Sequence, residues 1–170
     1  MSREYAASYA ASQSDPDGFW LNAARALDWE RAPTQGWSRQ EGWFADGILN
    51  TCHNAIDRHV EAGRGEQTAV IYESPVTGQT RHFSYAELRD EVARVAGMLA
   101  GLGVAKGDRV VIYMPMIPET LFAMLACARI GAVHSVVFGG FAAPELAKRI
   151  DDAKPKLLLT ASCGIEGQKV

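Results

Sequence analysis

The second half of the chain repeats one pattern of hydrophobic and polar positions. At Ser84 a Ser-x-x-Glu capping pattern opens a segment whose hydrophobic residues recur every three or four positions, which predicts a helix from residue 84 to about 102. Short apolar and β-branched runs at 109–113, 132–138 and 156–161 show no such period. Runs of this kind are typical of strands that are covered on both faces.

Two further helices are expected between these strands. Residues 117–130 are apolar on nearly every side, which predicts a buried helix with Gly131 at its C-cap. A second helix should start near Ala142, with Pro144 in its first turn, and end near Asp152. The alternation of helices and strands predicts an α/β fold, in which a parallel sheet carries helices on its faces.

The first half of the chain has weaker periodic signals. The first dozen residues should be loosely held, and a helix should run from Asp15 to about Leu27. Residues 28–42 lack a period and predict an extended arm over a larger body. Four aromatic residues are the expected anchors of that arm: Trp29, Trp37, Trp43 and Phe44. We therefore expect residues 1–50 to form an N-terminal helix and arm, separate from residues 51–170.

Residue 51 opens the larger part of the chain. A helix is predicted over 51–61, with Cys52, Ile56 and Val60 as a buried stripe. A β-hairpin should follow, with strands at 68–72 and 80–83 joined by a loop that contains proline and glycine.

Composition narrows the class of protein. The 170 residues are 48% hydrophobic and 22% charged, and their net charge is −3. Without a basic stripe a nucleic-acid partner is not expected, and no apolar run reaches the length of about 18 residues that a membrane span needs. The N-terminus lacks the apolar core of a secretion signal, so a cytoplasmic location is expected.

The cysteines indicate neither disulfides nor a metal site. Cys52, Cys127 and Cys163 are an odd, widely spaced set, which is not a disulfide framework. A metal site built from Cys52, His53 and His59 is not predicted, because residues one and six apart do not share a helix face.

No catalytic residue is predicted. The phosphate-loop signature is absent, and Ser135 lies within a strand instead of on a tight turn. His134, which lies in the run that we expect to be the central strand, is interpreted as a core or sheet-end histidine.

One feature remains, the turn from Phe138 to Phe141. Its glycines would let the backbone approach a ligand, and the following helix could favour an anion. A plain turn between a strand and a helix explains these residues equally well.

Several segments resemble one enzyme family. They read YMPMIPE at 113–119, LACARIGAVHSVVFGGF at 125–141, RIDDAKP at 149–155 and WFADGILN at 43–50. They are similar to AMP-forming acyl-CoA synthetases of the adenylate-forming superfamily, in the acetyl- and propionyl-CoA synthetase group. CHNAIDRH at 52–59, RIDDAKP and ALDWERAPTQ at 26–35 look more like the propionyl branch.

The resemblance implies a ligase that joins a short-chain carboxylate to CoA. Such enzymes use ATP with Mg²⁺ to form an acyl-adenylate and pyrophosphate, and CoA then displaces AMP. Residues 51–170 would be the first part of the large N-terminal domain, so the sheet should be incomplete. The phosphate loop, the acyl pocket and the catalytic lysine would lie beyond residue 170, and the chain alone should be inactive. Its partners would be these small molecules, the rest of the large domain and a C-terminal domain.

The resemblance also implies four binding residues. Phe138, Gly139 and Gly140 would lie beside the nucleotide end of CoA. Lys169 is the one residue that could serve where acetyl-type relatives place arginines near the CoA phosphates. Three hypotheses therefore stay open: part of a propionate- or acetate-activating ligase, a CoA- or nucleotide-binding module, and a structural lobe that binds nothing alone. We also expect exposed apolar surface that binds a hydrophobic dye.

Overall fold

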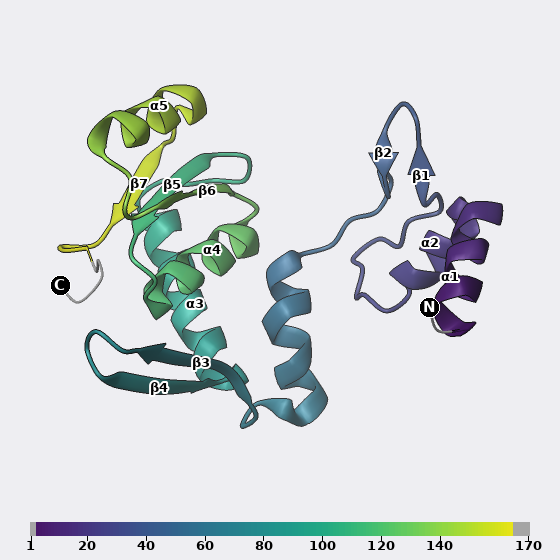
Figure 1. The fold of residues 1–170 in the computed structure, drawn as a ribbon, viewed down its shortest axis with the longest axis horizontal. Coiled ribbons are helices and arrows are strands. Elements are labelled where there is room, and N and C mark those ends of the chain that lie inside the picture. Colours follow the sequence, from purple (N-terminus) through teal and green to yellow (C-terminus); the bar gives the residue numbers. More distant parts are fainter. Residues whose placement is uncertain (1–2, 165–170) are drawn as a thin grey trace. The chain divides into compact units, whose positions relative to one another are not determined.

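The computed structural model describes residues 3–164, which fall into two compact units (Figure 1). One unit ends at Asn50 and the other begins at Thr51. Each unit is described by itself. No helix among residues 3–164 has the length and apolar character that crossing a bilayer requires.

The first unit begins with two helices, α1 (Arg3–Ser14) and α2 (Pro16–Ala24). The prediction that the first dozen residues are loosely held was wrong, since α1 is rich in alanine, the best helix former. The Asp15 carboxylate accepts a hydrogen bond from the Gly18 amide at 3.0 Å and caps α2. This helix ends before the predicted Leu27, because the last turn tightens and the Trp29 indole N–H donates to the Ala24 carbonyl at 2.8 Å.

The predicted arm contains regular structure. Strands β1 (Trp37–Ser38) and β2 (Gly42–Trp43) pair in antiparallel register. Strands of two residues are too short to show a hydrophobic period, which is why the sequence pattern missed them. The Asp46 carboxylate accepts hydrogen bonds from the Thr34 hydroxyl at 2.6 Å and amide at 2.8 Å, and these bonds lower the pKa of Asp46.

The aromatic residues of this unit pack on one another. The centroid of the Trp43 ring lies 5.5 Å from the ring centroid of Trp20, 6.3 Å from that of Trp37 and 6.0 Å from that of Phe44. Trp29 also meets Phe44 edge-on at 5.7 Å. Within residues 3–50, therefore, the predicted anchors form a shared aromatic cluster.

The second unit starts with a helical segment over residues 51–64. Two stretches of it, η1 (His53–Asp57) and η2 (Val60–Arg64), are wound as π-helix, and Gly63 has a positive φ of 77°. Cys52 and Ile56 are fully buried, as predicted, whereas Val60, the third residue of the predicted stripe, is only partly buried. The wider winding was not predicted, because a π-helical stretch of five residues is too short to show a hydrophobic period of its own.

A β-hairpin and a long helix follow. The hairpin pairs β3 (Thr68–Ser74) with β4 (Gln79–Ser84), and α3 (Tyr85–Gly101) begins directly after it. The capping box is confirmed: the Ser84 hydroxyl accepts from the Glu87 amide at 3.2 Å, and the Glu87 carboxylate accepts from the Ser84 amide at 2.8 Å.

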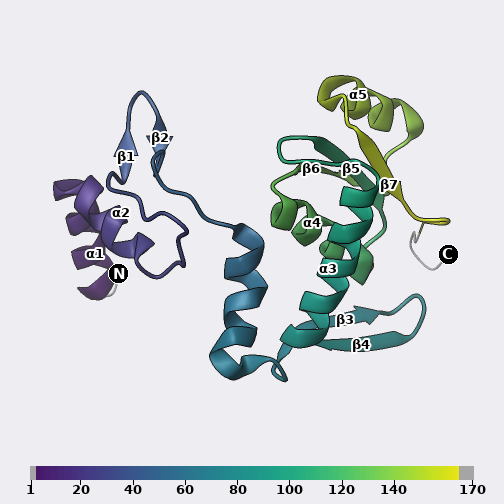
Figure 2. The ribbon, with the colours of Figure 1, turned by 180° about the vertical axis from the view of Figure 1, so that it is seen from behind.

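The sheet is parallel, as predicted. Strands β5 (Arg109–Met114), β6 (Val133–Phe138) and β7 (Leu157–Thr160) stand in the order β6-β5-β7, and the crossovers are α4 (Pro118–Ile130) and α5 (Ala143–Ala153). Helix α5 lies on the opposite face of the sheet from α3 and α4 (Figures 1 and 2). This arrangement confirms the α/β class.

Of the three parallel strands in the described residues, β5 alone is buried on both faces. Val110, Val111 and Ile112 have no exposed surface, whereas Val136 is 46% and Phe138 is 66% exposed. The prediction of full burial was therefore wrong for β6 and β7, because within the described residues each lies at an edge of the sheet. For the same reason His134 lies on an edge strand instead of the central one. The open edges agree with the expectation of an incomplete sheet.

Candidate functional site

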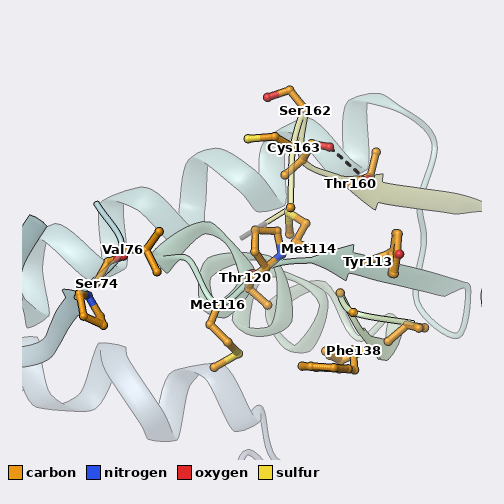
Figure 3. A pocket seen from close by; sticks show the side chains of 18 of the residues that line it. Ser74, Val76, Tyr113, Met114, Met116, Thr120, Phe138, Thr160, Ser162 and Cys163 are labelled. Atoms are coloured by element: carbon orange, nitrogen blue, oxygen red, sulfur yellow. Dashed lines mark hydrogen bonds between the residues drawn. The ribbon is translucent and has the colours of Figure 1, made fainter. Parts of the chain in front are cut away.

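A cavity of about 770 Å³ lies at the carboxyl ends of the three parallel strands (Figure 3). Its walls are residues 113–116 at the end of β5 and just after it, 136–140 at the end of β6 and just after it, 160–164 at the end of β7 and just after it, 73–76 at the tip of the β3–β4 hairpin, and Thr120 of α4. Open parallel sheets bind ligands at this end of their strands. The cavity is therefore the candidate binding site of the described residues.

The predicted glycine turn forms one wall of this cavity. It is closed by the Phe141 amide, which donates to the Phe138 carbonyl at 3.0 Å. A Cβ on Gly139 would lie 3.1 Å from the carbonyl oxygen of Met114, and a Cβ on Gly140 would lie 2.6 Å from the Phe138 ring. A side chain at Gly139 would therefore be tight against the backbone, and one at Gly140 would displace the Phe138 ring; neither glycine has a positive φ.

Phe138 presents an aromatic ring at the cavity. The residue is 66% exposed, and its ring meets the Phe141 ring edge-on, with 5.6 Å between the centroids. The Arg149 guanidinium lies 4.9 Å from the centroid of Phe141 and supports that ring by a cation–π contact. The exposed Phe138 ring could stack on a flat apolar group.

The wall after β5 is fixed by a local turn. The Pro115 carbonyl accepts from the Thr120 hydroxyl at 2.7 Å and from the Ile117 amide at 2.8 Å. Sequence reasoning missed Thr120 and Met116 as lining residues. The rule that singled out the turn after β6 could have found Met116, because it also follows the carboxyl end of a strand.

The cavity is nearly free of charge. Glu73 is the one charged side chain among the described lining residues, and no lysine or arginine accompanies it there. Lys169, the predicted phosphate contact, lies outside the described residues. The described wall therefore suits an uncharged group better than a phosphate.

The N-terminus of α5 was expected to favour an anion. The described lining of the cavity ends at Gly140 and Gly164, so the first turn of α5 is not part of it. Glu145, in that turn, already places a carboxylate there, and it pairs with Lys148 at 2.7 Å and Arg149 at 3.4 Å. The structure thus brings together the three predicted residues but not the helix N-terminus.

The described residues provide few side chains that could bind a metal ion. Nowhere in residues 3–164 do three His, Cys, Asp or Glu side chains gather as a metal site would require. Mg²⁺ is held by oxygen ligands, and among the described lining residues Glu73 supplies the one carboxylate. The described lining therefore does not fit the magnesium ion that accompanies ATP. His134 and Ser135 are not among the lining residues either.

A parallel sheet with a glycine turn and a cavity at its strand ends is typical of α/β proteins that bind a small ligand. The chain belongs to one family of that class, the AMP-binding enzymes, whose model matches residues 56–170. Residues 5–55 match a second model, described as the acetyl-coenzyme A synthetase N-terminus. These matches confirm the resemblance to AMP-forming acyl-CoA synthetases.

Three relatives are similar along nearly the whole chain. An uncharacterized protein of Pseudomonas aeruginosa is 61% identical, and the alignment covers 98% of this chain and 27% of that protein. The mitochondrial acyl-CoA synthetase short-chain family member 3 of Bos taurus is 53% identical, with coverage of 98% and 25%. An acetyl-coenzyme A synthetase of Bradyrhizobium diazoefficiens is 51% identical, with coverage of 98% and 26%. The chain thus spans about a quarter of the length of these curated relatives.

Proposed function

We propose that the protein to which this chain belongs is an acid–thiol ligase that activates a short-chain carboxylate. ATP and the carboxylate form an acyl-adenylate and release pyrophosphate. The CoA thiol then attacks the acyl carbon and releases AMP, which leaves an acyl-CoA thioester. The observation that carries the proposal is the similarity over 98% of the chain to proteins named acetyl-coenzyme A synthetase and short-chain acyl-CoA synthetase.

Propionate is the proposed carboxylate and acetate is the second candidate. The segments at 26–35, 52–59 and 149–155 favour propionate, because they resemble the propionyl branch. Acetate is favoured by the acetyl-coenzyme A synthetase of Bradyrhizobium diazoefficiens, which is 51% identical. A cytoplasmic location also remains a proposal, since the relative from Bos taurus is described as mitochondrial.

The role proposed for this chain is to hold the nucleotide end of CoA. Phe138, Gly139 and Gly140 would contact it at the cavity, and Lys169 would approach its phosphates. The exposed Phe138 residue and the described lining, in which Glu73 is the one charged side chain, support a contact with the adenine ring, which is flat and neutral. The described residues are expected to contribute no catalytic group.

The whole-protein proposal is tested with the full-length protein that contains this chain. Pyrophosphate release and acyl-CoA formation are measured with acetate, propionate and butyrate. A kcat/KM that is highest for propionate supports the first candidate, and one that is highest for acetate supports the second. A protein that releases no pyrophosphate with any of them contradicts the ligase and leaves a non-catalytic binding module or structural lobe.

The site proposal is tested by calorimetric titration of the chain with CoA, with ATP as a parallel control. CoA should release heat, and Gly140→Val should abolish it, because the new side chain would collide with the Phe138 ring at 2.6 Å. Gly97→Ala is a matched control, since nothing lies within 4 Å of a Cβ there. If neither CoA nor ATP binds, residues 138–141 are only a turn in the isolated chain.

A further inference from the structure

Tyr113 stands on the central strand of the described sheet. It belongs to β5, between Val137 of β6 and Thr160 of β7 in the register. The three residues before it, 110–112, are fully buried. A side chain on such a strand starts from a fixed position, which is what a binding site requires of its supporting residues.

The Tyr113 hydroxyl reaches the glycine turn. It donates a hydrogen bond of 2.7 Å to the carbonyl oxygen of Phe141. The amide of Phe141 donates to the Phe138 carbonyl at 3.0 Å. Both backbone polar groups of Phe141 are therefore occupied, one by the turn itself and the other by the central strand. The turn cannot move away from β5 without breaking the bond to Tyr113.

The Phe141 ring, which the bond to Tyr113 helps to hold in place, packs against the Phe138 ring. The rings of Phe138 and Phe141 meet at 84°, with their centroids 5.6 Å apart. The cation of Arg149 supports the Phe141 ring, 4.9 Å from its centroid. Because Phe141 is held in this way, its ring fixes one side of the Phe138 ring. The rest of Phe138 is exposed and can contact a ligand.

We propose that Tyr113 is a positioning residue for the nucleotide end of CoA. Through its bond to Phe141 it sets where the turn, and with it the Phe138 ring, stands at the cavity. This inference rests on the proposed function, because it assumes that residues 138–140 contact CoA. It adds a residue that lines the same cavity and acts on the turn through a single hydroxyl group.

The test replaces Tyr113 by phenylalanine in the full-length protein, which removes one oxygen atom and keeps the ring. Loss of one hydrogen bond should raise the KM for CoA about three- to tenfold and leave kcat at saturating CoA within about twofold. The KM values for ATP and the carboxylate should not change. Without ligand, the amide of Phe141, which donates to the Phe138 carbonyl, should exchange hydrogen faster than in the wild type, because the turn is no longer tied to β5.

Tyr72→Phe is the matched control. Tyr72 is also on a strand and packs at the edge of the core, but its hydroxyl makes no hydrogen bond to any residue of the range 3–164. Its replacement should leave every kinetic constant unchanged. An equal change in all KM values for Tyr113→Phe, or a KM for CoA that matches the wild type, overturns the inference alone. A wild-type protein that forms no acyl-CoA overturns the proposed function and the inference with it.

Discussion

The ion pair between Asp57 and Arg129 should be a main support of the second unit. One guanidinium nitrogen of Arg129, on α4, lies 2.9 Å from both carboxylate oxygens of Asp57, on η1. The side chain of Arg129 is 26% exposed and that of Asp57 is 16% exposed. The pair joins residues 72 positions apart, so it fastens the helical segment 51–64 to α4.

The exposed fractions place this pair between two known limits. Breaking a fully buried pair costs about 3–5 kcal/mol, and breaking an exposed pair costs about 0.2–1 kcal/mol. We expect Asp57→Asn or Arg129→Met to destabilise the unit by about 2 kcal/mol. The double variant should cost less than the sum of the two, with a coupling free energy of about 1.5 kcal/mol.

Native-state hydrogen exchange at the buried amides of α4 measures this loss. A cost of about 2 kcal/mol corresponds to exchange about thirtyfold faster. Arg94→Met is the matched control, because the Arg94 side chain is 69% exposed and pairs with Glu91 on the surface. If Asp57→Asn speeds exchange no more than this control, or if the two single effects simply add, the reasoning about the pair is refuted.

Four further outcomes follow from single features. Ser84→Ala should cost about 1 kcal/mol in the thermal unfolding of the second unit, since it removes half of the capping box; an unchanged melting temperature would contradict this. The exposed thiol of Cys163 should react with a thiol reagent at once, and that of the buried Cys127 only after unfolding. Burial raises the pKa of the Cys127 thiol from 9.0 to about 11. The stability that the neutral thiol contributes is therefore complete below pH 9 and should be lost between about pH 9 and 11. Cys127→Ala should make the free energy of unfolding depend less on pH in this range. A hydrophobic dye should fluoresce on the chain, and Val136→Lys should reduce its signal, because Val136 is 46% exposed on β6.

Most of the second unit could be read from the sequence, because its patterns are local. The capping box at Ser84, the positive φ at Gly131 and Pro144 in the first turn of α5 each follow from residues close together in the chain. The same holds for the turn at residues 138–141, which was singled out by its place after a strand. Such signals need no knowledge of the rest of the fold.

Long-range features could not be read in this way. The β-hairpin was predicted, but the position of its tip, with Glu73, at the cavity was not, since only the assembled fold brings it to the strand ends. The bond from Tyr113 to Phe141 joins residues 28 positions apart, and nothing in either segment indicates the other. Full burial of β6 was predicted from its composition, yet composition does not tell an edge strand from a central one.

The aromatic cluster of the first unit has a practical consequence for spectroscopy. All four tryptophans of the sequence, Trp20, Trp29, Trp37 and Trp43, belong to the unit that ends at Asn50. Indole emission therefore originates entirely from residues 1–50, while the parallel sheet and the cavity have no indole of their own. A single tryptophan introduced near the turn, for example Phe141→Trp in a background where the four are phenylalanine, would give the cavity its own optical signal.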